Sequence, residues 1–215
     1  MGGPPTPVKV VIAGGFGVGK TTMVSSISDI PPLTTEGHMT TMAAGVDDRT
    51  AVQSKTSTTV AMDFGRARLD GDIILYLFGT PGQDRFGFMW DNLVKGALGA
   101  IVLVDTRRID DCYPAVDYFE HRQVPFIVGV NQFEGQQLPP LDDVRWALDL
   151  GPTTPIVVVD ARSRLSALDA LLTLLMHNMT RLEARLAEIT PTAPPPTRSR
   201  LIQPDPGWDR SPTGL

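Results

Sequence analysis

Residues 14–21 constrain the fold of this chain more than any other part of its sequence. They read Gly-Gly-Phe-Gly-Val-Gly-Lys-Thr and match the pattern G-x-x-x-x-G-K-[ST]. The apolar run Val8–Ala13 precedes them and a helical pattern follows, which is the strand–loop–helix context of a phosphate-binding loop. Glycines let successive N–H groups converge on phosphate oxygens, and the helix N-terminus adds positive potential. The sequence therefore predicts a nucleotide-binding α/β domain.

The pattern gives each residue of this loop an expected role. Lys20 should contact the β- and γ-phosphates, and the Thr21 hydroxyl should bind Mg²⁺. The alternative is a glycine-rich turn that precedes Lys and Thr by coincidence, which would not require a strand before it and a helix after it. The predicted phosphate-binding residues are Gly14, Gly15, Phe16, Gly17, Val18, Gly19, Lys20, Thr21 and Thr22.

Short Val/Ile/Leu runs alternate with helical patterns along the chain. This alternation predicts an α/β, P-loop NTPase fold whose mostly parallel, six-stranded sheet carries helices on both faces. Asp70-Gly71-Asp72 supplies a tight hairpin turn between the second and third strands, so one strand should be antiparallel. The predicted strands are Val8–Ala13, Thr59–Leu69, Ile73–Phe78, Ala100–Asp105, Pro125–Asn131 and Pro155–Val159.

The last helical pattern carries one apolar stripe with alternating spacings of three and four residues. Such a stripe predicts either a long helix packed on the sheet or a coiled coil, and packing on the sheet is the favoured interpretation. The stripe consists of Leu165, Leu168, Leu172, Leu175, Met179, Leu182 and Leu186.

Three segments lie outside these regular patterns. Residues 1–6 are expected to be flexible, residues 7–189 to form the domain, and the Pro-rich residues 190–215 to be disordered. Residues 28–57 form an irregular stretch longer than ordinary loops, and this length makes the stretch a candidate switch segment.

Composition excludes several classes of function. Lys+Arg 19 against Asp+Glu 24 leaves no basic face for nucleic acid. The longest apolar stretch, Gly96–Val104, is far shorter than the ~20 residues that cross a bilayer, so no membrane span is expected. Cys112 is the single cysteine, which rules out an intramolecular disulfide. This is typical of a protein of a reducing compartment or of one indifferent to redox conditions, and the cytoplasm is the expected location.

From Thr59 onward the order of motifs resembles the Ras superfamily of small GTPases. The resemblance is closest to Rab-type proteins and to the Ras-like GTPases of bacterial conservon operons and gliding-motility systems. Residues 59–64, Thr-Val-Ala-Met-Asp-Phe, are similar to the Thr-Ile-Gly-Val-Asp-Phe of Rab switch I. The resemblance implies that Thr59 binds Mg²⁺ and senses the γ-phosphate. Ser57 and Thr58 lie alongside, so the role could fall one residue away, or all three could be solvated loop hydroxyls.

A second resemblance covers residues 79–86, Gly-Thr-Pro-Gly-Gln-Asp-Arg-Phe, which are similar to the Asp-Thr-Ala-Gly-Gln-Glu-Arg-Phe of switch II. It implies that the Gly82 N–H binds the γ-phosphate and that Gln83 orients the attacking water, so the expected catalytic residues are Gln83, Lys20 and Gly82. The alternative is a Pro-Gly turn with polar flanks.

Two further motifs end the fifth and sixth predicted strands, at the sheet edge where ligands bind in open α/β folds. Asn131-Gln132-Phe133-Glu134 stands where the family has Asn-Lys-x-Asp, and Asp160-Ala161-Arg162 stands where it has Ser-Ala-Lys. The resemblance implies that Glu134 accepts hydrogen bonds from guanine, that Ala161 offers its N–H to the guanine carbonyl and that Arg162 flanks the base. The expected base-binding residues are Asn131, Gln132, Glu134, Asp160, Ala161 and Arg162.

Two positions depart from the family pattern. Gly79 replaces the switch II Asp that holds a Mg²⁺-bound water, and Asp47, Asp48 and Asp63 are candidates to replace it. Phe16 stands where the family has a small residue, and its ring either crowds Gln83 or packs outward as an apolar anchor. The arginines near the predicted switch segments, none of which can be singled out as an arginine finger, are Arg49, Arg66, Arg68 and Arg85.

These motifs imply a GTP/GDP- and Mg²⁺-binding switch that hydrolyses GTP slowly without an activator. The alternatives are a nucleotide-binding scaffold with little hydrolysis, a site with relaxed ATP/GTP specificity, and a small-molecule or nucleoside kinase. A kinase would need an acceptor pocket and usually an Arg-bearing lid, and the sequence has no evident lid. The resemblance also implies a regulatory partner, of the roadblock type, that contacts the switch segments 28–59 and 80–90. The apolar cluster expected at that contact is Phe86, Phe88, Met89 and Trp90.

Overall fold

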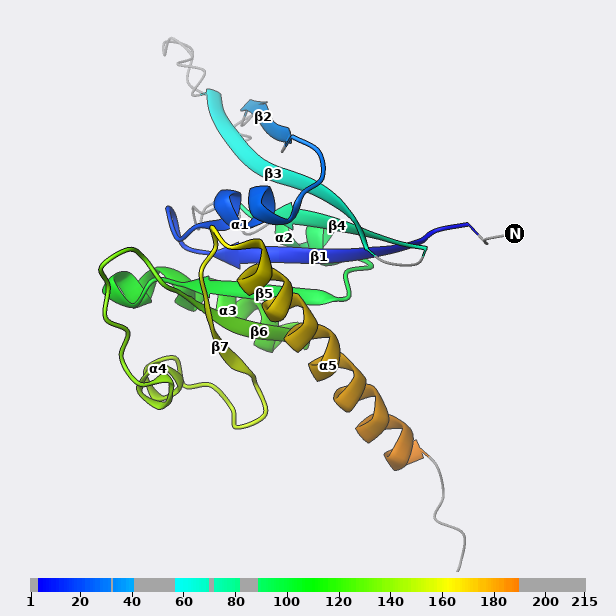
Figure 1. Cartoon of the computed structure of the whole chain (residues 1–215), viewed down its shortest axis with the longest axis vertical. Helices are drawn as coiled ribbons and strands as arrows, with labels where there is room; N and C mark the ends of the chain where they lie inside the picture. The colour runs from blue at the N-terminus through cyan, green and yellow to red at the C-terminus, as the bar shows by residue number, and fades with distance from the viewer. Residues whose placement is uncertain (1–3, 32, 41–56, 70–71, 82–88, 190–215) are drawn as a thin grey trace, which may run out of the picture.

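One mixed sheet of seven strands organises the chain in the computed structural model (Figure 1). The structure describes residues 4–31, 33–40, 57–69, 72–81 and 89–189. The strands are β1 Thr6–Gly14, β2 Leu33–Thr40, β3 Ser57–Leu69, β4 Ile73–Gly79, β5 Gly99–Val104, β6 Phe126–Asn131 and β7 Ile156–Val159. The helices are α1 Lys20–Ile27, α2 Trp90–Val94, α3 Tyr113–His121, α4 Leu141–Ala147 and α5 Arg164–Ile189, and a 3₁₀ segment, η2, covers Thr106–Cys112.

The sheet confirms the predicted fold class. Its order is β2-β3-β4-β1-β5-β6-β7, and β3 alone runs antiparallel to its neighbours. All six predicted strands are present, and β2 is a seventh, within the stretch 28–57 that was expected to be irregular. Its sequence, Leu-Thr-Thr-Glu-Gly-His-Met-Thr, has no apolar alternation. Backbone pairing with β3 forms this edge strand, and a side-chain pattern does not report such pairing.

The two faces of the sheet carry separate apolar cores. In β1, Val10 and Ile12 face α1 and α5, whereas Val11 and Ala13 face α2, α3 and α4. This division follows from the two-residue period of a strand, which sends successive side chains to opposite faces. Val10, Val11, Ile12 and Ala13 of β1 are at most 1% exposed, so the glycine-rich loop follows a strand that is fully buried at its carboxyl end (Figure 1).

The structure corrects one expected surface residue. Trp90, placed by prediction in an exposed partner-binding cluster, is 5% exposed. Its ring stacks on Phe119 and meets the edge of Tyr118, with centroid separations of 6.2 and 5.1 Å. The Trp90 side chain therefore belongs to the core under α3. Phe86 and Phe88 lie outside the described residues.

The structure also corrects the predicted packing of the last helix. The side chains of α5 that bury against the sheet are Ala167, Ala170 and Leu174. Of the predicted stripe only Leu168 is half-buried, and the other six residues are between 42% and 76% exposed. The small alanines allow the helix to approach the strands closely: a Cβ on Gly99 of β5 would lie 3.0 Å from Leu174 Cδ1. A stripe of Leu and Met would hold the helix farther away.

β1 begins at Thr6, one residue inside the segment expected to be flexible, and the Pro-rich residues 190–215 lie outside the described residues. Within the described ranges, no helix has both the length and the apolar character that crossing a bilayer requires.

Candidate nucleotide-binding site

The glycine-rich loop joins the carboxyl end of β1 to the first turn of α1, as predicted. Gly14 and Gly19 have φ of 127° and 108°, in the region that favours glycine. A Cβ at Gly14 would lie 2.3 Å from the Leu103 carbonyl oxygen, and one at Gly19 would lie 2.7 Å from Asn131 Nδ2. Both glycines are therefore required by backbone geometry and by close packing against β5 and β6.

Lys20 is buried under the loop, where its amine is held by the loop itself. Nζ donates to the Gly14 and Gly15 carbonyl oxygens at 2.9 and 2.6 Å. Burial lowers the pKa of the Lys20 ammonium to about 8, and the charge of Asp63 partly opposes this shift. Both hydrogen-bond partners are neutral carbonyls, so the Lys20 ammonium gains when charged phosphate oxygens replace them.

We expect phosphate binding to weaken as Lys20 loses its proton. The free protein releases this proton near pH 8, whereas bound phosphates favour the ammonium, so the pKa of Lys20 in the complex must be higher. Affinity should therefore change little below about pH 7 and fall by up to roughly tenfold per unit above about pH 8. Titrations of a fluorescent nucleotide across this range measure the effect. Lys20→Ala is the control, because only the ligand's own ionisation remains there; equal pH profiles would contradict the expectation.

The Thr21 hydroxyl meets a carboxylate from β3. Thr21 Oγ1 donates to Asp63 Oδ2 at 2.6 Å, and the Asp63 residue is 8% exposed. Asp63 pairs in register with Gly79 of β4, and a Cβ on Gly79 would lie 2.9 Å from the same Oδ2. The Asp63 carboxylate thus occupies the space that a side chain at position 79 would fill. Of the three candidates to replace the missing Asp, the structure brings Asp63 to the site; Asp47 and Asp48 lie outside the described residues.

A hydroxyl beside a carboxylate fits the oxygen chemistry of Mg²⁺. Within the described ranges, no group of three or more His, Cys, Asp or Glu side chains could hold a metal ion by itself. Mg²⁺ at a nucleotide site is commonly held by one or two protein oxygens together with phosphates and waters. Thr21 and Asp63 are the residues that fit.

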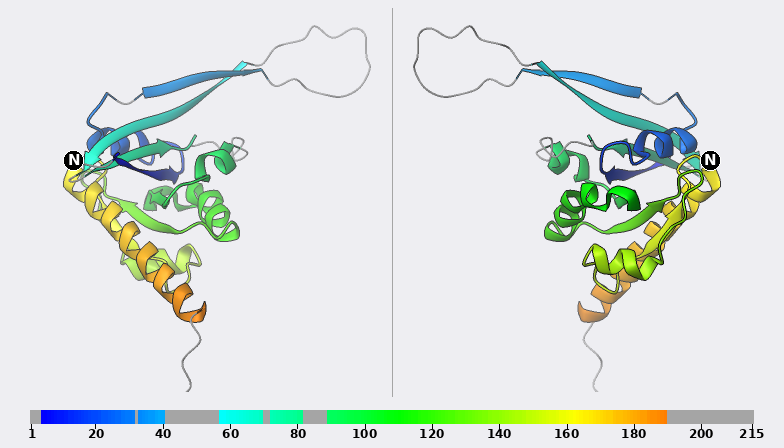
Figure 2. Two further views of the ribbon diagram at one scale, coloured as in Figure 1. Left: turned by 90° about the vertical axis from the view of Figure 1, so that its right-hand side faces the viewer. Right: turned by 90° about the vertical axis from the view of Figure 1, so that its left-hand side faces the viewer.

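Other predicted site residues are not brought to this point. Thr59 pairs with His38 in the β2–β3 hairpin, which projects from the sheet (Figure 2), four residues and about 13 Å along β3 from Asp63. The structure therefore does not join Thr59 with Thr21. Gly82 and Gln83 lie outside the described residues.

Asn131 connects the three loops that surround the predicted base position. It is 4% exposed. Its Nδ2 donates to the Val18 carbonyl at 2.9 Å, and its Oδ1 accepts from the Ala161 N–H at 3.1 Å. The Ala161 N–H, expected to bind the guanine carbonyl, is therefore engaged by Asn131. One buried amide ties the loop after β6 to the phosphate loop and to the loop after β7.

An open pocket of about 150 Å³ lies beside Asn131. Arg162 crosses its rim: Nε and Nη2 donate to the two Asp160 carboxylate oxygens at 2.9 and 3.0 Å, and Nη1 lies 3.7 Å from Glu134 Oε2. These hydrogen bonds lower the pKa of Asp160. The pocket is lined by Gly17, Gly19, Thr22, Asn131, Gln132, Phe133, Glu134, Asp160, Ala161 and Arg162. It thus joins the phosphate loop to both predicted base-binding motifs.

Two arginines of η2 belong to the site although the sequence did not single them out. Arg108 Nη2 donates to the Phe16 carbonyl at 2.7 Å and is the nearest side-chain atom to a Cβ built on Gly17, at 3.4 Å. Arg107 forms paired hydrogen bonds with the buried Asp105 and lies 4.2 Å above the Phe133 ring. The start of η2 directly after β5, at the ligand-binding edge, was the available signal.

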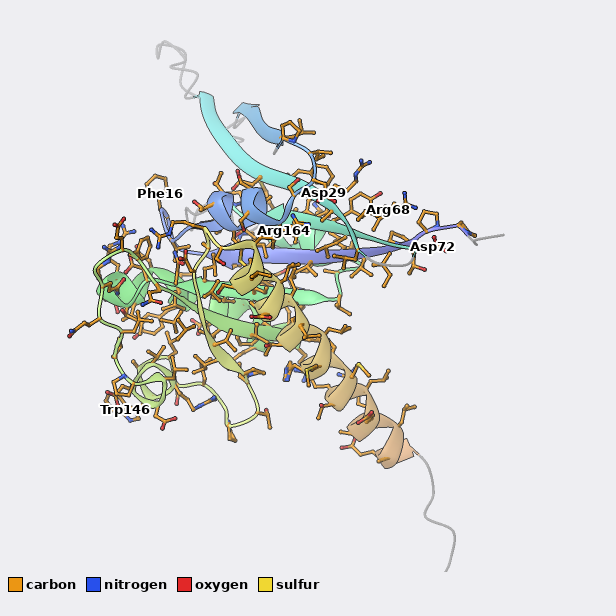
Figure 3. The ribbon with its side chains drawn as sticks, viewed as in Figure 1. Phe16, Asp29, Arg68, Asp72, Trp146 and Arg164 are labelled. Atoms are coloured by element: carbon orange, nitrogen blue, oxygen red, sulfur yellow. The ribbon has the colours of Figure 1, made fainter. Side chains whose placement is uncertain are left out.

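The side chain of Phe16 does not pack as an apolar anchor among the described residues. It is 67% exposed and projects from the loop away from the sheet (Figure 3). Whether it crowds Gln83 stays a prediction, because Gln83 lies outside the described residues. Arg108 instead provides a cation next to the Phe16 backbone.

Comparisons with known proteins agree with a nucleotide-binding P-loop fold. An uncharacterized protein of Methanocaldococcus jannaschii is 29% identical over 127 residues, which are 58% of this chain and 70% of that protein. The cytosolic domain of the Thermotoga maritima FeoB iron transporter in its GDP form matches with a TM-score of 0.56 at 16% identity, over 82% of this chain and 65% of that chain. The FeoB G-domain from Methanococcus jannaschii matches with a TM-score of 0.53 at 10% identity, over 81% and 99%.

The chain spans about two thirds of the length of the Thermotoga maritima domain, and identities this low show a shared fold. A family described as conserved hypothetical ATP binding protein matches residues 12–181. This range holds the phosphate loop, Asp63, Asn131 and the Asp160–Arg162 motif. Because it covers well over half of the chain, the chain belongs to that family of P-loop nucleotide-binding proteins.

Proposed function

We propose that this protein is a guanine-nucleotide switch of the small-GTPase type, which hydrolyses GTP slowly and signals through segments 28–59 and 80–90. The observation that carries the proposal is the position of Glu134. Its carboxylate lies at the rim of the pocket that begins at the phosphate loop, beside Arg162. The likeness to bacterial conservon-type and gliding-motility-type GTPases supports the same conclusion.

Guanine and adenine differ in what they offer to such a carboxylate. Guanine presents N1–H and an exocyclic amine side by side, and a carboxylate can accept both in charge-assisted hydrogen bonds. Adenine offers no such pair. Glu134 is one methylene longer than the family's Asp, and Arg162 Nη1 lies 3.7 Å from Glu134 Oε2. The description of the matching family names ATP, so base choice is the point that most needs a test.

We expect competition titrations to rank GTP and GDP above ATP and ADP. The Glu134 side chain is 93% exposed in the free protein, so the preference comes from the two hydrogen bonds that guanine adds. At about 0.5–1.5 kcal/mol net for each, the pair corresponds to a preference of roughly 5- to 100-fold. Glu134→Ala should erase the preference and leave phosphate-driven binding in place. Asp142→Ala, on α4 and outside the pocket lining, is the matched control. Tighter binding of ATP than of GTP by the unchanged protein would overturn the guanine assignment without affecting the phosphate-loop assignment.

Hydrolysis is expected to be slow because the sequence sets a bulky Phe16 in the phosphate loop and does not single out an arginine finger. A single-turnover assay should give a rate at or below ~10⁻⁴–10⁻³ s⁻¹, the range of a small GTPase without its activator. Gln83→Leu should lower any partner-stimulated rate, and Phe16→Gly should raise it. Nucleotide bound tightly with no turnover, with or without partner, would favour the nucleotide-binding scaffold instead.

Magnesium and a protein partner complete the proposal. Thr21 and Asp63 would hold Mg²⁺, which neutralises charge on the β- and γ-phosphates when it is bound. Lys20 would turn from the loop carbonyls to the phosphates, and Asn131 would hold the three loops in fixed positions relative to one another. A roadblock-type regulator that binds the switch segments is the expected partner.

A further inference from the structure

Helix α5 has two apolar faces, and the sheet covers only one of them. Ala167, Ala170 and Leu174 bury against the strands. The second face carries the stripe of alternating three- and four-residue spacing from Leu165 to Leu186, most of which is exposed. Positions with this spacing correspond to a and d of a heptad repeat, the pattern that packs one helix against another.

The exposed face is long and continuous. Helix α5 runs from the sheet into solvent, and its last turns extend past the strands (Figure 1; Figure 2). The apolar surface widens at its other end, where Leu168, Leu172 and Leu175 line an apolar groove together with Leu69 and Ile73. A monomer rarely exposes a contiguous apolar patch of more than a few hundred Å².

The area available matches what a stable dimer requires. Seven Leu and Met side chains of α5 are exposed, and half-exposed side chains of this size present roughly 100 Å² each. On the order of 700 Å² per copy is therefore available before the groove is counted, close to the ~800 Å² per partner of a standard interface. The exposed residues are Leu165, Leu172, Leu175, Met176, Met179, Leu182 and Leu186.

We propose that α5 is a dimerisation helix, whose exposed heptad stripe pairs with the same stripe of a second copy of this chain. A second copy supplies a helix with an identical repeat, so the a and d side chains of one copy can pack against those of the other. Because the sheet occupies the opposite face of α5, the helix has one face left and takes one partner helix. The assembly is therefore a dimer.

The charges on α5 favour a protein partner over a membrane surface. A helix that lies on a membrane is rich in Lys and Arg on its polar face. Helix α5 instead balances its charges, with Arg164, Arg181 and Arg185 against Asp169, Glu183 and Glu188. The sequence that follows α5, residues 190–215, is rich in Pro and carries no such repeat of Leu and Met.

The same charges favour parallel pairing. Asp169 and Glu183 both occupy position e of the repeat, and Asn178 occupies position g. In an antiparallel pair e faces e, which would set Asp169 beside Glu183 of the second copy. In a parallel pair e faces g, which sets Glu183 beside Asn178 of the second copy and avoids facing like charges.

Sedimentation of the full-length chain over a micromolar concentration series tests the dimer. We expect a species of twice the 23.3 kDa of one chain that dissociates on dilution. Met179→Glu with Leu182→Glu should raise the dissociation constant by roughly a hundredfold or more, because two charges enter the apolar seam. Thr180→Glu with Ala184→Glu adds the same charge on the same turns outside the stripe and should leave the dimer intact. All four positions are at the solvent-exposed end of α5, and unchanged thermal unfolding shows that each variant folds.

Cysteine cross-linking tests the orientation. In a parallel pair, Leu172→Cys and Leu182→Cys should each form a disulfide-linked dimer, whereas an antiparallel pair brings at most one of them near its own copy. The native Cys112 is buried and its thiol pKa is raised to about 12, so Cys112 should not form a disulfide in this assay. A monomer at every concentration, or equal dimerisation by both double variants, would overturn the proposal. Co-flotation of a monomer with anionic vesicles would assign the face to a membrane instead.

Discussion

Lys20→Ala should remove most of the nucleotide affinity of this protein, by roughly a hundredfold or more. Lys20 supplies the side-chain cation that the phosphate loop holds ready, and hydrogen bonds from a charged donor contribute about 1.5–3 kcal/mol each. In the structure its amine is bound to the Gly14 and Gly15 carbonyls, which it can leave when phosphate oxygens arrive. A fluorescent-nucleotide titration measures the loss.

Lys9→Ala is the matched control for this experiment. Lys9 lies on the same strand, β1, and donates to the Lys95 carbonyl at 3.1 Å, away from the phosphate loop. Its removal should leave nucleotide affinity unchanged. Thermal unfolding of both variants separates lost binding from lost folding. Normal binding by a folded Lys20→Ala protein would refute the phosphate-loop assignment itself.

Asp63→Asn should abolish the contribution of Mg²⁺ to nucleotide binding. Asn keeps the shape of the side chain and can still accept from Thr21, but it removes the carboxylate charge beside the Thr21 hydroxyl. We expect affinity in Mg²⁺ to fall by roughly 10- to 100-fold, the range measured when groups that support a metal site are removed. In EDTA, affinity should stay equal or rise, because a negative charge near the phosphates has gone.

The comparison of Mg²⁺ with EDTA distinguishes a metal role from a structural one. A purely structural defect weakens binding under both conditions. Thr21→Ala should show the same selective loss in Mg²⁺, and the two substitutions should not add, since they act on one site. Asp72→Asn, at an exposed residue ahead of β4, controls for net charge. Binding by Asp63→Asn that matches the unchanged protein in Mg²⁺ would show that another group replaces the missing switch II Asp.

Local sequence pattern is sufficient to predict several elements of this fold. The phosphate loop, the six predicted strands and the antiparallel pairing of β3 with β4 were all predicted correctly. Each depends on residues adjacent in the chain: glycines at fixed spacing before Lys20, apolar runs between turns, and the turn-forming sequence Asp-Gly-Asp at 70–72. Edge strand β2 was missed because its pairing uses backbone groups, which every sequence possesses.

The sequence alone predicted a phosphate-binding loop at the end of β1, and the structure has the positive-φ glycines and the helix start that this loop geometry requires of neighbouring residues. Tertiary structure decided which carboxylate reaches Thr21. Asp63 does so because the β3–β4 register sets it opposite Gly79, where the absent side chain leaves room. It also decided that Ala167 and Ala170, and not the larger leucines, face the sheet, since close approach to the strands excludes bulk. Burial and register depend on what lies across the sheet, and a linear pattern does not contain that information.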